Sequence, residues 1–97
     1  MQPSLRVRAI EDAIVSSLEA THVEVVDNSA DHANHLGAED GGGHFAVVVV
    51  SEAFRSLSRV AAQKLVYETL AELMREDIHA LSMRTFTPEQ WTADRHA

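Results

Sequence analysis

Histidine is the residue type in this 97-residue chain best suited to binding a transition metal or moving a proton near neutral pH. The chain contains six histidines and no cysteine. The lack of cysteine excludes disulfides, thiol nucleophiles and any zinc or iron–sulfur site held by the chain's own thiolates. A metal bound by this chain must therefore use His, Asp or Glu, and the candidate ligands are His32, His35, His44 and His79.

A zinc hydrolase is one chemistry that the histidine spacing permits. His32, His35 and His44 would supply three nitrogen ligands, with Glu39 as the general base. Catalytic zinc sites need a rigid frame, however, and these residues lie in or beside a segment that contains Gly41-Gly42-Gly43. We therefore expect a protein that is not an enzyme.

The charge of the chain is unevenly distributed. The net charge is −7, residues 1–54 contain two arginines and nine acidic residues, and residues 55–97 contain six basic and six acidic residues. Duplex binding normally requires several Lys or Arg side chains to replace condensed counterions. The charge therefore disfavours nucleic acid and favours a protein partner with a basic surface. The basic residues that could form a local patch all lie in the second half: Arg55, Arg59, Lys64, Arg75, Arg84 and Arg95.

The first half of the chain predicts a helix, a strand, a long loop and a second strand. Residues 5–18 have apolar side chains at helical spacing, and residues 22–26 are rich in β-branched residues. Residues 28–43 have the composition of a long loop, which in a compact domain is often functional. Residues 44–51 contain a continuous apolar run, which predicts a central strand buried on both faces.

The second half predicts a turn, a helix, a strand and a short helix. Ser58 is the expected N-cap of a helix that runs to about Glu76, and residues 78–86 alternate like a strand. In that alternation His79 falls on the same face as Leu81. Thr87-Pro88-Glu89-Gln90 predicts a capping box that starts the last helix, with Trp91 as an apolar anchor.

Together these elements predict one α/β (α+β) domain spanning residues 1–97. The expected order is α-β-β-α-β-α, with a three-stranded mixed sheet and helices on one face. The longest strongly apolar run, residues 46–50, is far shorter than the roughly 20 residues of a membrane span, and no signal pattern is present at the N-terminus. We therefore expect a cytoplasmic protein that has no membrane partner.

Several segments, in their order and spacing, resemble the BolA family. They are the strand and turn Phe45-Ala46-Val47-Val48-Val49-Val50-Ser51-Glu52-Ala53-Phe54, the helical segment of residues 65–73, Ile78-His79-Ala80-Leu81 and Thr87-Pro88-Glu89-Gln90-Trp91. The resemblance extends over nearly the whole chain, including the His-containing loop. It implies a fold similar to the class II KH domain, in agreement with the element order.

The resemblance also implies a function in iron–sulfur cluster assembly, trafficking or iron regulation. BolA-like proteins pair with monothiol glutaredoxins and share a [2Fe–2S] cluster, whose other ligands are a glutaredoxin cysteine and glutathione. By resemblance, His79 is one ligand and a loop histidine is the other: His32 matches most directly, and His35 or His44 could replace it. Imidazole replaces thiolate on one iron of Rieske centres, so the chemistry suits a chain without cysteine. On this basis we expect no cofactor in the isolated chain.

Two departures from the family pattern affect the predicted partner surface. The family usually has F-x-G after the central strand, whereas this chain has Phe54-Arg55-Ser56. It usually has R-H-R on the long helix, whereas this chain has Ala62-Gln63-Lys64. Lys64 and Arg84 are the predicted partner-binding residues, and a weak homodimer remains open.

The alternative function is a nucleic-acid-binding transcriptional or stress-response regulator of the BolA type. KH-like folds bind single strands in other proteins. This chain lacks the G-x-x-G loop that clamps the nucleic-acid backbone in KH domains, and its charge weighs against that function.

Overall fold

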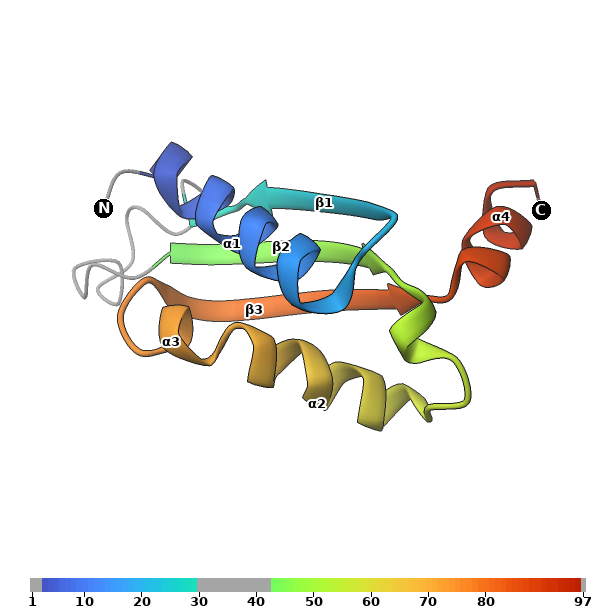
Figure 1. Ribbon diagram of the computed structural model, residues 1–97. Helices are drawn as coiled ribbons and strands as arrows, with labels where there is room; N and C mark the ends of the chain where they lie inside the picture. Colours follow the sequence, from blue (N-terminus) through green and yellow to red (C-terminus); the bar gives the residue numbers. More distant parts are fainter. Residues whose placement is uncertain (1–2, 30–42, 97) are drawn as a thin grey trace.

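The computed structural model describes residues 3–29 and 43–96, which form a three-stranded mixed sheet and its helices (Figure 1). The strands are arranged in the order β1-β2-β3, with β1 antiparallel to β2 and β3 parallel to β2. This arrangement confirms the predicted α+β fold. The strands are β1 (His22–Asp27), β2 (Gly43–Val50) and β3 (Ile78–Phe86).

The helices α1 and α2 cover one face of the sheet, while α4 lies beyond the end of β3 (Figure 1). A short 3₁₀ helix, η3, connects β2 to the turn before α2. The element order confirms the predicted α-β-β-α-β-α arrangement. The bounds are α1 (Pro3–Leu18), η3 (Glu52–Phe54), α2 (Arg59–Thr69), α3 (Ala71–Met74) and α4 (Pro88–His96).

The core lies between the helices and the sheet. Its buried side chains form one cluster from α1, β2, η3, α2 and the start of β3. Phe45, Val47 and Val49 of β2 are at most 2% exposed, whereas Ala46 and Val48 on the opposite face are only partly buried. The prediction that this strand is buried on both faces is therefore wrong, because α1 and α2 cover only one face. We call the other face, which contains Ala46 and Val48, the open face.

One end of the open face is covered by Trp91 of α4. The Trp91 ring stacks on His22 at a centroid distance of 5.0 Å and lies 5.2 Å from the Phe86 ring. His22 and Phe86 are the neighbours of Val50 on either side in the sheet. Val50 is 1% exposed, so Trp91 is the apolar anchor that the sequence predicts.

Local hydrogen bonds confirm two predicted helix starts. The Ser58 hydroxyl accepts the Ala61 N–H at 3.0 Å. In α4, the Thr87 hydroxyl accepts the Gln90 N–H at 3.2 Å, and the Gln90 side chain accepts the Thr87 N–H at 2.9 Å. This reciprocal pair is a capping box.

The long helix is shorter than predicted. It ends at Thr69, and Leu70 has φ −99° and ψ 11°, which leaves the helical region and separates α2 from α3. Leu70 is 1% exposed and belongs to the core cluster. The turn therefore places the Leu70 side chain in the core, and the chain then enters β3. No helix among the described residues is long and apolar enough to span a bilayer.

Candidate metal centre at the loop end of the sheet

Two of the four predicted ligands, His44 and His79, lie together at the start of β2 and β3. Their ring centroids are 5.2 Å apart and the rings are tilted by 49°. His44 comes from β2 and His79 from β3, so strand pairing brings together residues that are distant in sequence. We call them the histidine pair. His32 and His35, and the zinc base Glu39, lie outside the described residues.

A β-bulge positions His79. Gly43 is opposite Ile78 and His44 is opposite Ala80, so His79 has no partner on β2. Ile78 is 3% exposed and lies in the core, and Leu81 packs against that core three residues later. The strict alternation predicted for residues 78–86 is therefore wrong at its start. The bulge frees His79 from the core face and leaves it exposed beside His44.

Gly43 is required immediately before the histidine pair because there is no room for a side chain. A Cβ at residue 43 would lie 2.5 Å from Cε2 of Phe45 and 2.9 Å from Oγ of Ser29. The Phe45 ring is buried in the core and cannot easily move away. The close packing at Gly43 therefore fixes the backbone that carries His44.

Hydrogen bonds from the end of β1 hold the backbone of His44. The Ser29 hydroxyl accepts the His44 N–H at 3.1 Å, and the Asn28 N–H donates to the His44 carbonyl at 2.7 Å. The Asp27 carboxylate accepts the Ser29 N–H at 2.8 Å and orients that residue. Both main-chain groups of His44 are thus bound to the segment that directly follows β1.

Asp77 fastens the other strand of the site. Its carbonyl accepts the Gly43 N–H at 3.0 Å, and its carboxylate oxygen Oδ1 lies 3.6 Å from Nε of Arg6 on α1. The Arg6 side chain is 16% exposed, so this ion pair is largely shielded from solvent. The start of β3 is therefore connected to both β2 and α1, two residues before His79.

The histidine pair has a spacing suitable for binding one metal ion through two nitrogens. Two imidazoles held by bonds of about 2.0–2.1 Å in tetrahedral geometry have centroids about 5 Å apart. Within residues 3–29 and 43–96, no three His, Asp or Glu side chains form a metal-binding group. The described residues thus offer two nitrogens toward a site that needs further ligands.

The predicted partner-binding residues lie away from this pair. Lys64 is exposed on α2, whereas Arg84 is exposed in the second half of β3, with its guanidinium 5.0 Å from the centroid of the Phe86 ring. Along β3, Arg84 is roughly 16 Å from His79 at about 3.3 Å per residue. The structure therefore does not join Lys64, Arg84 and the histidine pair into one site.

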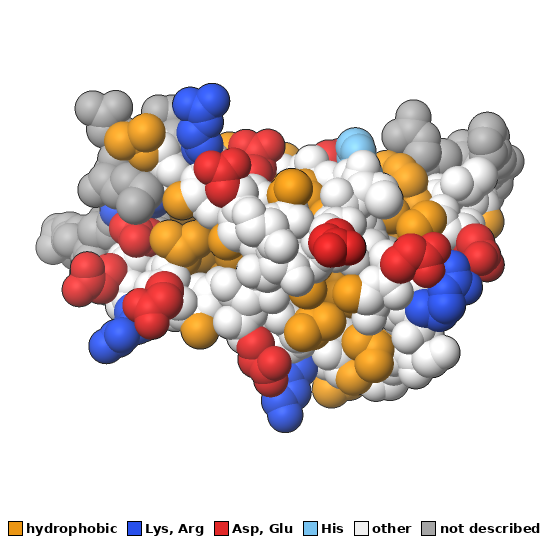
Figure 2. Space-filling model, in the orientation of Figure 1, with side chains coloured by type: hydrophobic (Ala, Val, Ile, Leu, Met, Phe, Trp, Pro, Cys, Tyr) orange, Lys and Arg blue, Asp and Glu red, His pale blue; other side chains and the backbone are white. Residues whose placement is uncertain are grey.

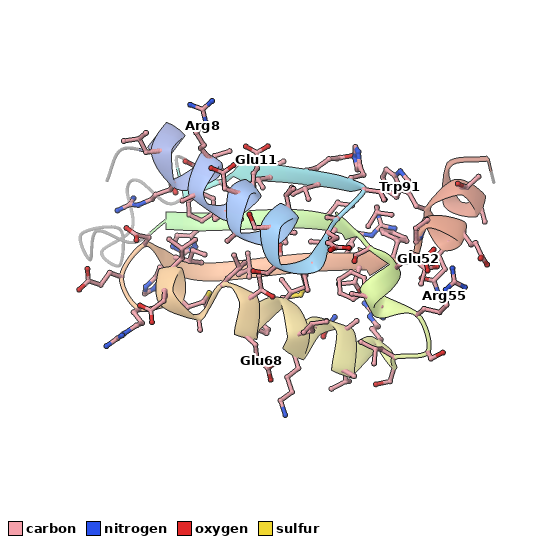
Figure 3. The ribbon with its side chains drawn as sticks, in the orientation of Figure 1. Arg8, Glu11, Glu52, Arg55, Glu68 and Trp91 are labelled. Carbon is pink, nitrogen blue, oxygen red and sulfur yellow. The ribbon has the colours of Figure 1, made fainter. Side chains whose placement is uncertain are left out.

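Two basic residues of the second half, Arg55 and Arg75, are paired with acidic side chains. Arg55 donates to both carboxylate oxygens of Glu52, at 2.7 and 2.8 Å, and to Glu89 of α4 at 3.0 Å (Figure 3). Arg75 lies 3.5 Å from Glu72. On the helix-covered face, acidic side chains are interspersed with the few basic ones (Figure 2). These contacts support a surface of mixed charge.

Sequence reasoning missed the role of His22. Its Nε2 lies 2.7 Å from Oε2 of Glu24, and its ring stacks on Trp91 with planes 24° apart. Alternation along β1 places the side chains of His22 and Glu24 on the open face. No feature of the sequence, however, indicates where α4 lies. His22 is thus part of the contact that fixes α4.

Comparisons with known proteins agree with this fold. The model of the family described as BolA-like protein matches residues 14–90. The chain is 34% identical over 82 residues to the DNA-binding transcriptional regulator BolA of Escherichia coli (strain K12), covering 84% of this chain and 75% of the relative. It is also 34% identical over 79 residues to the acid stress protein IbaG of the same organism, covering 80% and 94% of the two chains.

A solved structure shows the same architecture. The BolA domain of SufE1 from Arabidopsis thaliana superposes with a TM-score of 0.76 at 34% identity, covering 87% of this chain and 93% of that chain. The family match covers most of the chain, and both the sheet order and the identity of these relatives agree with it. The chain therefore belongs to the BolA-like protein family.

Proposed function

We propose that this protein is a non-enzymatic partner of a monothiol glutaredoxin and shares a [2Fe–2S] cluster with it in iron–sulfur cluster assembly, trafficking or iron regulation. The observation that carries the proposal is the histidine pair, in which two imidazoles from different strands lie 5.2 Å apart. His79 is the first ligand. His44 is the second ligand that the described residues support, with His32 and His35 of the loop as its alternatives.

The ligand count requires a partner. In Rieske-type centres two imidazoles replace two thiolates on one iron, and two thiolates hold the other iron. The histidine pair can supply the first set, but the chain has no cysteine for the second. A glutaredoxin cysteine and glutathione complete the set, so the cluster lies between the two proteins.

Co-expression with a monothiol glutaredoxin tests this assignment. The purified complex is expected to show the visible absorption and circular dichroism of a [2Fe–2S] cluster. His79→Ala and His44→Ala should each reduce or alter that spectrum. His22→Ala is the matched control, because His22 contacts Trp91 at the other end of the sheet and should leave the cluster spectrum unchanged.

Two results would overturn parts of the proposal. A spectrum unchanged in His79→Ala removes that residue as a ligand. A spectrum lost in His32→Ala or His35→Ala but retained in His44→Ala moves the second ligand into the loop. Far-UV circular dichroism of each variant separates ligand loss from unfolding.

A second candidate function is DNA binding, because a relative with 34% identity is named a DNA-binding transcriptional regulator. Duplex binding through phosphate contacts must weaken steeply as salt is added. The test is a titration with a promoter-length duplex at low and moderate salt. Lack of binding at low salt removes this candidate, whereas salt-sensitive binding that is lost in Arg84→Gln supports it.

A further inference from the structure

A groove separate from the metal centre lies between the second half of β3 and the start of α2. It has a volume of about 680 Å³ and is open to solvent. The walls are apolar at Phe54, Leu57, Phe86 and Ala93, and two cations, Arg59 and Arg84, line the same space. We call it the β3–α2 groove. It lies at the end of β3 opposite the histidine pair.

The β3 side of the groove is an edge of the described sheet. The order β1-β2-β3 leaves the outer side of β3 without a neighbouring strand. The Phe86 carbonyl accepts the Ser51 N–H at 2.9 Å, so the main-chain groups of Phe86 point toward β2. Main-chain direction alternates along a strand, and Thr85 therefore directs its N–H and C=O outward, toward the groove.

The first half of the same edge is partly occupied by a side chain. The Tyr67 hydroxyl of α2 lies 3.5 Å from the Leu81 carbonyl, which also points away from β2. Edge strands with free main-chain groups accept an added strand from another chain. The segment beside the groove, Arg84–Phe86, is thus where an extended peptide can pair with β3.

Charge and shape indicate what kind of peptide fits. Arg84 is held over the Phe86 ring at 5.0 Å, and Arg59 forms no ion pair with any residue in the described part of the chain. Two arginines suit one carboxylate, whereas a nucleic-acid strand needs a longer row of cations to replace its counterions. Leu57 is 42% exposed at the groove and offers apolar contact to the peptide.

The groove ends near α4. Phe54 of η3 and Gln90 and Ala93 of α4 line it; in Figure 1, α4 lies past the end of β3 and the segment that follows β2 lies beside that end. A strand added beside β3 therefore stops at these elements instead of running on. We propose that the β3–α2 groove binds the C-terminal tail of a partner protein as an added strand, with its last apolar side chain beside Leu57 and its terminal carboxylate between Arg59 and Arg84.

The test is peptide binding to the ¹⁵N-labelled protein followed by NMR. The probe is an acetylated octapeptide that ends in Val-Leu with a free carboxylate. Chemical shifts are expected to change at Ser58–Ala62 and Arg84–Phe86. Amidation of the terminus should weaken binding about tenfold through loss of the charge-assisted hydrogen bonds. N-methylation of the peptide's penultimate residue should also weaken it, through loss of a strand hydrogen bond.

Protein variants check the two cations. Arg59→Gln and Arg84→Gln should each weaken binding, whereas Arg8→Gln, which removes an exposed charge from α1 outside the groove, should not. Equal binding of the free and amidated peptides, no binding at millimolar peptide, or shifts confined to other elements would each overturn the proposal. So would tighter binding of a single-stranded oligothymidine at the same residues.

Discussion

Ser56 adopts a left-handed backbone conformation, with φ 68°, at the position where the family pattern places glycine. A residue with a side chain in the left-handed backbone region costs about 1–2 kcal/mol of conformational free energy relative to glycine. The backbone of this turn is therefore strained at Ser56. Ser56→Gly is expected to raise the free energy of unfolding by about 0.5–1 kcal/mol, after the greater flexibility of glycine in the unfolded chain is subtracted.

Urea denaturation measures this difference. Ser56→Ala is the matched control, because alanine keeps the strained φ and should not stabilise the protein. If Ser56→Gly proves neutral or destabilising, the strain at this turn is relieved by contacts of the serine side chain.

A second prediction concerns the close packing around Gly43. Gly43→Ala places a methyl group within 3 Å of both Phe45 and Ser29, and is expected to destabilise the fold by roughly 1–3 kcal/mol. Because the same backbone carries His44, the variant should also lose cluster binding beyond the effect of stability alone. Unfolding curves and the cluster spectrum in the presence of a glutaredoxin are the measurements, with Ala46→Gly on the open face as control. A cluster spectrum that survives intact would show that His44 need not be held in place.

At the residue scale, the sequence predicted which histidines could be ligands but not how their side chains lie relative to one another. His44 and His79 were both candidates from their chemistry and the family pattern, and the structure places their rings together. The bulge at His79 has no signature in the alternation of residues 78–86, because the apolar residues there satisfy either register. Only the pairing of β3 with β2 and the burial of Ile78 distinguish the two possible registers.

At the scale of elements, α4 depends on a small number of contacts. Trp91 stacks on His22 and packs against Phe86 with the two rings tilted, and Glu89 pairs with Arg55. Trp91→Ala is expected to lower stability by about 1–2 kcal/mol, since it removes partly buried aromatic contacts. Hydrogen exchange of the α4 amides should accelerate more than exchange in β2. Thr92→Ala, on the exposed side of α4, is the control; similar exchange in both variants would mean that Trp91 does not anchor the helix.

The ion pair between Glu52 and Arg55 at η3 has a defined pH dependence. The hydrogen bonds from Arg55 lower the pKa of Glu52 below its ordinary value of 4.5. A carboxylate whose pKa is lowered in the folded state stabilises the fold above its unfolded pKa, and this contribution is lost as the pH falls through the folded pKa. The melting temperatures of wild-type protein and Arg55→Gln should therefore differ at pH 7 and converge as the pH falls below the folded-state pKa of Glu52.

The control for this pH series is Lys64→Gln, which removes one positive charge from α2 without disturbing the Arg55 contacts. A difference between wild-type protein and Arg55→Gln that stays constant down to pH 3 would contradict the assignment to Glu52. Because this ion pair is exposed, we expect its effect on the melting temperature to be small.

Element boundaries followed from the sequence where a local signal existed. Ser58 and Thr87 are N-caps as predicted, because capping depends on residues within one turn. The break at Leu70 and the one-sided burial of β2 depend on which face of the sheet the helices cover. No local sequence pattern predicts which face that is. The continuous apolar run of β2 thus fits a strand buried on one face equally well.

At the scale of the whole molecule, the histidine pair and the β3–α2 groove lie at opposite ends of β3. In the proposed complex the glutaredoxin would bind at the histidine pair, at the end of the sheet away from the groove. Since a ligating imidazole must be neutral, the proposed shared cluster should be released as the pH is lowered and protons compete with iron for the imidazole nitrogens. The fading of the cluster absorption between pH 7.5 and 5.5 is the measurement, and a glutaredoxin homodimer with all-thiolate ligation is the control. Equal acid stability of the two complexes would argue against imidazole ligation.

Because of the β-bulge, the side chain of residue 79 is not part of the core. A residue that has no partner on the neighbouring strand and projects into solvent can be replaced without repacking the interior. Variants at this position should therefore fold as well as the wild-type protein while lacking only the imidazole. They are suited to replacing the normal protein in a cell, where any loss of function then reports on the site and not on a shortage of folded protein.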